Sequence, residues 1–231
     1  RFGTNHIATA TMINNLAVMR EDTGDAAGAE QYLREAAAIL RKLPGPPANL
    51  AYPLFGLQRF HLYRGEYDQA KEICEEAYRV TLASGGDKHP LTTTARSMLS
   101  LVKAHLKEPD AEALARETLQ LQQAALPPGH IEIARSMVVL SRVLLLSGLA
   151  VKAGEAESVL RQAHAMTRKI YPQKNWRPAE AQALLAMAIA LGGNTPRRQD
   201  DSRQLMEEAW QEMRDALPEN HPRALEVARL R

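Results

Sequence analysis

The sequence has little cysteine and few aromatic residues. Its single cysteine, Cys74, excludes an intrachain disulfide and a zinc site built from several cysteines. Aromatic residues make up 5% of the chain, whereas alanine and leucine are abundant. Valine and isoleucine are too sparse for many strands, and alanine and leucine lose little conformational freedom in a helix. The composition therefore favours an all-α protein.

The chain also lacks an excess of one charge and any long apolar run. Its 29 basic and 27 acidic residues give a net charge of +2, without the basic excess typical of nucleic-acid binding. The longest apolar runs, such as Met137–Leu146, fall short of the roughly 20 residues that span a bilayer. We expect a cytoplasmic protein with no nucleic-acid partner and no membrane insertion. The missing initiator Met and the end in mid-pattern favour a fragment of a longer protein.

Common catalytic and nucleotide-binding motifs are missing as well. The sequence contains no GxxxxGK[ST] or GxGxxG phosphate-binding loop, no GxSxG elbow and no HExxH metal motif. Four histidines, at positions 6, 89, 130 and 221, hold equivalent places at the starts of repeated segments. Residues spaced one per repeat do not converge on a metal, so we interpret them as helix-start residues. We expect no catalytic residues, no cofactor and no metal.

What the sequence does contain is a repeat. Gly24 and Gly65 lie 41 positions apart, and so do Ala36 and Ala77. His89 and His130 repeat the same spacing, which lengthens to 45 or 46 near the C-terminus. A fixed period in this range indicates a solenoid, in which each unit buries its apolar face against its neighbours.

Each unit has two helical segments joined by a turn. The units span about 5–42, 48–84, 87–126, 130–171 and 175–217, and residues 221–231 form a truncated further helix. We expect one solenoid domain over residues 1–231. Extended turns are predicted in unit four and in unit five, where the second helix is expected to begin at Ser202.

Small and large apolar residues alternate at the predicted helix joints. Ala29 and Ala70 are expected to let paired helices approach closely, while Leu16, Leu57 and Leu140 fill the space between them. By the same register Cys74 is a core residue; a reactive thiol is the less favoured alternative.

The segment Asn14–Ala17, followed by Gly24, Ala29 and Ala36, resembles a tetratricopeptide repeat. The repeat unit of 41 to 46 residues, with a His-Pro pair at the start of some units, is similar to the kinesin-light-chain type of this repeat. The resemblance implies a right-handed α-α superhelix whose concave wall is lined by the first helix of each unit. Similar units occur in bacterial multidomain regulators involved in signalling, including C-terminal regions of serine/threonine kinases.

The resemblance also implies which side chains face the concave groove. The groove-facing positions are Asn14, Asn15, Val18, Phe55, Arg59, Tyr63, Ser97, Leu101, Arg135, Val138 and Arg142. The three arginines make the middle of this wall basic, and arginine can hold a carboxylate in two hydrogen bonds. An extended, partly acidic peptide is therefore the predicted ligand. The alternative, that these arginines pair with glutamates of neighbouring units, stays open.

Two function classes follow. The first is a non-catalytic protein-interaction scaffold that binds another protein or a peptide. The second is a regulatory domain that senses a peptide or a small ligand and controls an attached effector such as a kinase. An enzyme is disfavoured because no set of acid, base and nucleophile is apparent. The C-terminal stacking face also offers a surface for self-association.

Overall fold

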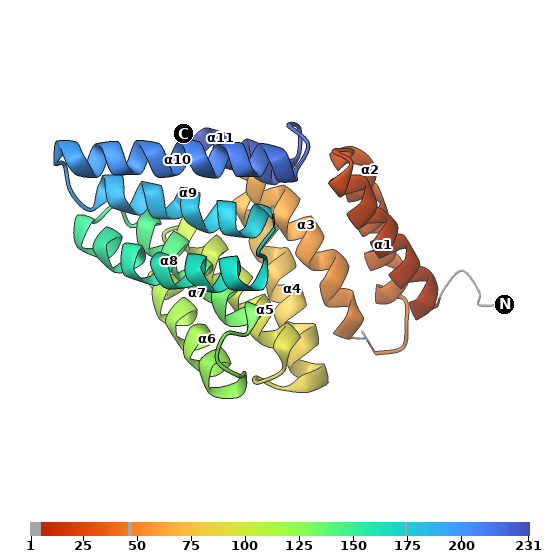
Figure 1. Cartoon of the computed structure of the whole chain (residues 1–231). Helices are drawn as coiled ribbons and strands as arrows, with labels where there is room; N and C mark the ends of the chain where they lie inside the picture. Colours follow the sequence, from red (N-terminus) through yellow and green to blue (C-terminus); the bar gives the residue numbers. More distant parts are fainter. Residues whose placement is uncertain (1–5, 46–47, 174) are drawn as a thin grey trace.

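The computed structural model describes residues 6–45, 48–173 and 175–231, which contain helices and their connections but no strand. The helices are α1 (Ile7–Asp22), α2 (Ala26–Arg41), the 3₁₀ turn η1 (Ala48–Leu50), α3 (Ala51–Arg64), α4 (Tyr67–Gly85), α5 (Pro90–His105), α6 (Ala111–Ala125), α7 (Ile131–Leu146), α8 (Ala150–Ile170), α9 (Trp176–Leu191), α10 (Pro196–Ala216) and α11 (Pro222–Leu230). They form five antiparallel pairs and one further helix (Figure 1). The predicted all-α solenoid is confirmed.

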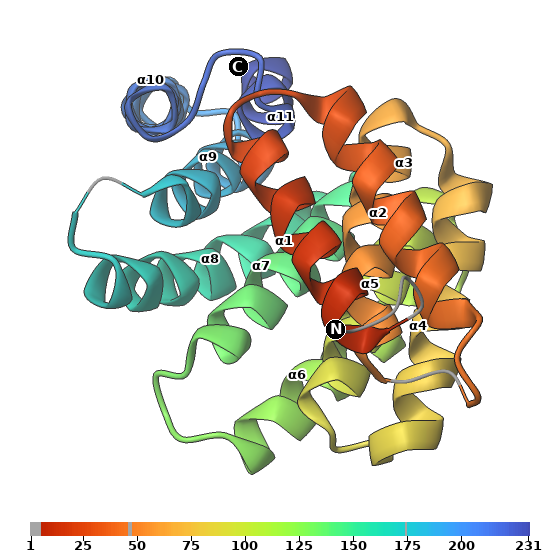
Figure 2. The same cartoon turned by 90° about the vertical axis from the view of Figure 1, so that its right-hand side faces the viewer.

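The stack of helix pairs curves until its last helix meets an early one (Figures 1 and 2). Helix α11 contacts α3, far from it in the sequence. Asn220 Nδ2 donates a hydrogen bond to the Gly24 carbonyl oxygen over 3.2 Å, and Arg229 Nη1 donates one to the Tyr63 carbonyl oxygen over 3.3 Å. Helix α11 therefore closes the inner face of the solenoid against α3.

Histidines begin four of the helices. The Nδ1 atoms of His6, His89, His130 and His221 each accept a hydrogen bond from the backbone N–H two residues later, over 3.0 to 3.2 Å. The side-chain oxygen of Asn175 does the same for α9. These side chains satisfy backbone donors that have no partner within the helix. The prediction that the repeated histidines are helix-start residues is confirmed.

Small residues hold the helix pairs together, as predicted. Ala29 and Ala70 are completely buried, and a methyl group at these positions lets the helix backbones approach closely. Leu140 is buried in the largest core cluster, and Leu57 belongs to the cluster that joins units one and two. The repeat period thus places the same kind of side chain at the same joint in successive units.

The prediction for Leu16 is wrong. Its side chain is 46% exposed, whereas the equivalent Leu57 and Leu140 are 4% and 3% exposed. Leu57 is covered because the unit before it packs against α3. No helix of the described residues precedes α1, so the same face of α1 stays in solvent together with Met12 and Met19.

Cys74 lies in the core, as its place in the repeat predicts. It is 2% exposed and packs in a cluster with Ala70, Leu99 and Val102. Burial raises the pKa of its thiol because the charged thiolate is poorly solvated there. The side chain is therefore a small apolar core residue rather than a reactive thiol.

Both extended turns are wrong predictions. Helix α8 begins at Ala150, directly after the short Ser147–Leu149 connection. In unit five, α10 begins at Pro196 rather than Ser202 because Thr195 caps it and proline suits the first helical turn. The residues that lengthen the later units therefore extend α8 and α10, each 21 residues long.

Candidate functional site

The inner face of the solenoid encloses a cavity of about 510 Å³. Its walls come from α3, α5, α7 and α9, with single contributions from α6, α8 and α11. Eight of the side chains predicted to face a groove line it: Phe55, Arg59, Tyr63, Ser97, Leu101, Arg135, Val138 and Arg142. Residues from three separate repeat units thus converge on one space, of a size typical of ligand pockets.

The three groove residues predicted in unit one do not line this cavity. Asn14, Asn15 and Val18 all belong to α1, which contributes no residue to the described lining. Val18 is 47% exposed. Helix α11 meets α3 directly, so the cavity is closed at α3 and α1 stays outside its wall.

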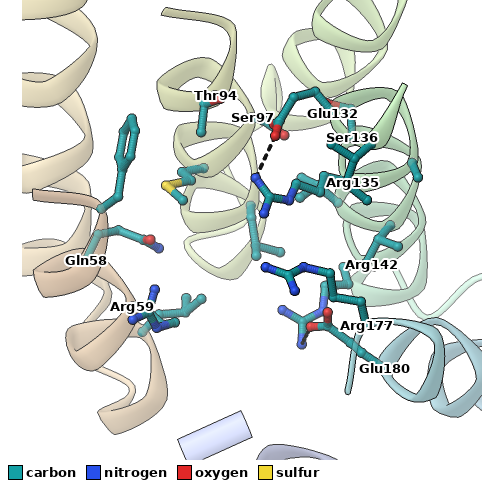
Figure 3. Close-up of a pocket in the computed structure, with 18 of the residues that line it drawn as sticks. Gln58, Arg59, Thr94, Ser97, Glu132, Arg135, Ser136, Arg142, Arg177 and Glu180 are labelled. Carbon is teal, nitrogen blue, oxygen red and sulfur yellow. Dashed lines mark hydrogen bonds and ion pairs between the residues drawn. The ribbon is translucent and has the colours of Figure 1, made fainter. Parts of the chain in front are cut away.

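Most of the cavity wall is apolar. The apolar and aromatic lining comprises Tyr52, Phe55, Leu62, Tyr63, Pro90, Leu91, Met98, Leu101, Ile131, Ala134, Val138, Val139 and Trp176. Polar side chains are distributed around the wall, among them Thr94, Ser97 and Ser136. In Figure 3, Arg59 lies on α3, and Arg135, Arg142 and Arg177 reach toward it from the opposite side. This combination suits a ligand with an apolar body and few polar groups.

The three predicted groove arginines are paired with carboxylates. Arg59 makes a two-bond contact with Glu21 of unit one, with Nε 3.0 Å from Oε1. Arg135 contacts Glu132, one turn earlier on α7, at 2.6 Å. Arg59 therefore pairs with a neighbouring unit, as the open alternative stated, whereas Arg135 pairs within its own unit. Both pairs make the wall less basic than a count of arginines indicates.

Arg142 ties α7 to the last two units. Its guanidinium contacts Glu226 of α11 and lies 3.7 Å from Glu180 of α9. Burial alone would lower the pKa of Arg142, but the two carboxylates outweigh it and raise that pKa. This ion pair is part of the contact that holds α11 over the cavity.

Arg177 is a cavity residue that the sequence did not reveal. It stacks over the rings of Trp176 and Tyr171, with its guanidinium carbon 4.3 and 5.1 Å from the ring centres. Among the described residues it has no ion pair, and its buried Nε has no hydrogen-bond partner. The helix caps could have indicated this residue. Asn175 caps α9 as His130 caps α7, so Arg177 is the second residue of its helix, as Glu132 is of α7.

The cavity carries one surplus positive charge in the described structure. Five arginines line it: Arg59, Arg135, Arg142, Arg177 and Arg223. Four carboxylates lie within 4 Å of them: Glu21, Glu132, Glu180 and Glu226. Arg223 shares Glu180 at 3.9 Å and also lies over Trp176. The surplus charge therefore belongs to Arg177.

No metal centre is found in the described ranges, where no group of three or more His, Cys, Asp or Glu could hold an ion. Within those ranges, too, no helix combines the length and the apolar character needed to cross a membrane.

Comparison with known proteins supports the fold. The tetratricopeptide repeat family model matches residues 9–46. TPR-like repeats assigned to a kinesin light chain of Podosopora anserina share 19% identity over 91% of this chain and 97% of that chain, with a TM-score of 0.60. BtubC (BKLC) from P. vanneervenii shares 18% identity over 87% and 81%, with a TM-score of 0.63.

The apo form of RapI shares 14% identity with this chain over 97% of it and 82% of that chain, with a TM-score of 0.64. No curated protein matches the sequence. The predicted resemblance to kinesin-light-chain-type tetratricopeptide repeats is thus confirmed. At these low identities, the solved structures show a similar fold over most of the chain.

Proposed function

Starting from this tetratricopeptide-repeat fold, we propose that the protein is a non-catalytic interaction scaffold that binds an extended peptide segment in its inner cavity. Proteins of this fold are generally non-catalytic scaffolds. The observation that carries the proposal is the convergence of eight groove-facing side chains from three units on one cavity. The repeat units together form a concave site with apolar walls and a few polar groups. Such a site can bind a peptide more specifically than an open, flat surface can.

The peptide is proposed to be partly acidic. The cavity arginines exceed the carboxylates that face them, so the cavity favours a ligand of negative charge. The excess is small, because Arg59, Arg135 and Arg142 are already paired. A ligand with one or two acidic groups among apolar side chains is therefore preferred over a polyacidic one.

A second candidate function is a regulatory domain that senses a peptide or a small ligand. The closure of α11 against α3 favours it. A ligand that contacts both α3 and α9 would bias the spacing of these helices, and α11 would transmit the change to any attached effector. This candidate differs from a plain scaffold in requiring that α11 move when the cavity fills.

The experiment is selection from a phage-displayed library of random 12-residue peptides. Thr94 lies in the cavity wall, and a tryptophan there would obstruct part of the space (Figure 3). Gln123 is an exposed residue of α6 and serves as the control. We expect peptides selected on the wild type to lose binding to Thr94→Trp and keep it with Gln123→Trp. Selected peptides that bind Thr94→Trp as well as the wild type would refute the proposal.

Acid preference is tested separately with Arg135→Glu. This residue pairs only with Glu132 among the described residues and is half exposed, so its replacement spares the α7–α11 contact that Arg142 makes. Acidic peptides should lose affinity, and neutral ones should not.

Self-association through the C-terminal end stays a prediction, which sedimentation velocity across a range of concentrations would check.

A further inference from the structure

We infer that Arg177 is the anchor for a single carboxylate of the bound peptide, placed beside an apolar side chain of that peptide. The inference rests on the proposed function, because it names the group that the same cavity recognises. It adds a specificity-determining residue that lies outside the repeat-derived set of groove positions.

The first observation is that Arg177 is a partly buried cation with no counter-ion in the described parts of the chain. Its Nε is buried and makes no hydrogen bond, although the rings of Tyr171 and Trp176 lie against the guanidinium. Aromatic faces attract a cation but accept none of its in-plane N–H hydrogen bonds. Unpaired buried polar groups are rare in folded proteins, and an arginine that carries one at a cavity wall is a candidate for contact with a ligand.

The second observation is the contrast with its neighbours. Arg59, Arg135 and Arg142 line the same cavity, and each has a carboxylate within hydrogen-bond distance. Glu180, three residues after Arg177, is 3.7 Å from Arg142 and 3.9 Å from Arg223 instead. The protein therefore neutralises the other cavity arginines internally and leaves Arg177 for an external anion.

The folded protein does not stabilise the charge of Arg177. Burial and the positive charges of Arg135 and Arg223 lower the pKa of Arg177, so the folded protein disfavours this charge. Removing the charge relieves this penalty and gives up the two ring contacts, so the protein without peptide should keep its stability, whereas removing a structural arginine leaves a carboxylate unpaired. A charge that the fold disfavours, held at a cavity wall, fits a functional role.

Ligand class follows from charge and surroundings. One surplus positive charge matches one carboxylate better than a phosphate group, which carries nearly two negative charges near neutral pH. The planar guanidinium suits the two oxygens of a carboxylate. Apolar side chains, among them Ile131 and Val139, line the same cavity and can take the neighbouring side chain of the peptide.

The test compares two capped tripeptides, acetyl-Leu-Glu-Leu-amide and acetyl-Leu-Gln-Leu-amide, which differ only in the charge. Their affinities are measured by NMR titration of the wild type, Arg177→Gln and Arg203→Gln. Arg203 is an exposed arginine of α10 paired with Asp200 and is the matched control. We expect the wild type and Arg203→Gln to prefer the Glu peptide about tenfold, as a charged hydrogen bond allows. Arg177→Gln should bind both peptides equally.

Thermal unfolding without peptide supplies the second readout. The melting temperature of Arg177→Gln should equal or exceed that of the wild type; a clear decrease would indicate a structural role and overturn the inference. Equal binding of the two peptides by the wild type, or a preference that survives in Arg177→Gln, would also overturn it. The proposed function fails separately, if Thr94→Trp leaves peptide binding unchanged.

Discussion

Replacing Glu226 by glutamine is expected to release α11 from the cavity without unfolding the rest of the solenoid. The side chains of Arg142 and Glu226 are 15% and 25% exposed, so their ion pair is largely shielded from water. A hydrogen bond to a charged group contributes about 1.5–3 kcal/mol. Arg142 keeps Glu180 at 3.7 Å, which offsets part of the loss. We therefore expect a cost of about 2 kcal/mol, or a roughly 30-fold larger opening constant for α11.

Native-state hydrogen exchange is the assay, because it reports the opening of single elements. Amides of α11 should exchange about 30-fold faster in Glu226→Gln than in the wild type, while amides of α4 and α5 keep their rates. Glu219→Gln is the control: Glu219 precedes α11 and pairs with Arg214 at 3.3 Å, but its side chain is 80% exposed. An exposed pair contributes at most about 1 kcal/mol, so its effect should stay below about fivefold.

Two results would refute this reasoning. Unchanged α11 exchange in Glu226→Gln would show that the ion pair does not hold the helix. Equal acceleration in every helix would show that α11 does not open on its own, so that the solenoid unfolds as one unit. Either result would also weaken the regulatory alternative, which needs α11 to move separately.

Three further predictions concern stability. Lys107 has a φ of 58°, the left-handed position that glycine takes in other turns, so Lys107→Gly should stabilise by about 0.5–1 kcal/mol in urea unfolding; destabilisation would contradict this. Leu140→Ala should cost about 2–5 kcal/mol and Leu16→Ala under about 1 kcal/mol, because only Leu140 is buried; equal costs would refute the assignment. Burial and the charge of Arg142 lower the pKa of His105 to about 4. The unfolded chain therefore takes up the proton first, and stability that is complete above pH about 6.5 falls toward pH 4, by about 1 kcal/mol after allowing for solvent screening. His105→Gln should flatten urea midpoints between pH 7 and 4, and an unchanged slope would contradict the attribution.

Local signals in the sequence predicted the helices well. Gly24 and Gly65 have positive φ values, and the capping histidines start helices where the repeat places them. The errors came where a local signal was ambiguous. Polar residues after Thr195 resemble a loop, but a cap followed by proline starts a helix there, and the helix continues through them. Helix caps are more informative than composition at such places.

The cavity was only partly predictable. The groove positions that the resemblance implies on α3, α5 and α7 line one cavity, because equivalent positions of stacked units face the same side. The repeat register could not show that Arg59 pairs with Glu21, 38 positions away, or that Arg142 pairs with Glu226, 84 positions away. Those pairs depend on how tightly the whole stack curves.

The sequence by itself determined the period, the helix pairs, their caps and the small residues at their joints, since each depends on residues within one unit or its immediate neighbour. Only the tertiary structure decided that α11 returns to α3, that α1 stays outside the cavity and that Arg177 remains without a carboxylate. The physical reason is that small rotations between units add up along the solenoid. Their sum sets which distant charges meet, and no single repeat contains that information.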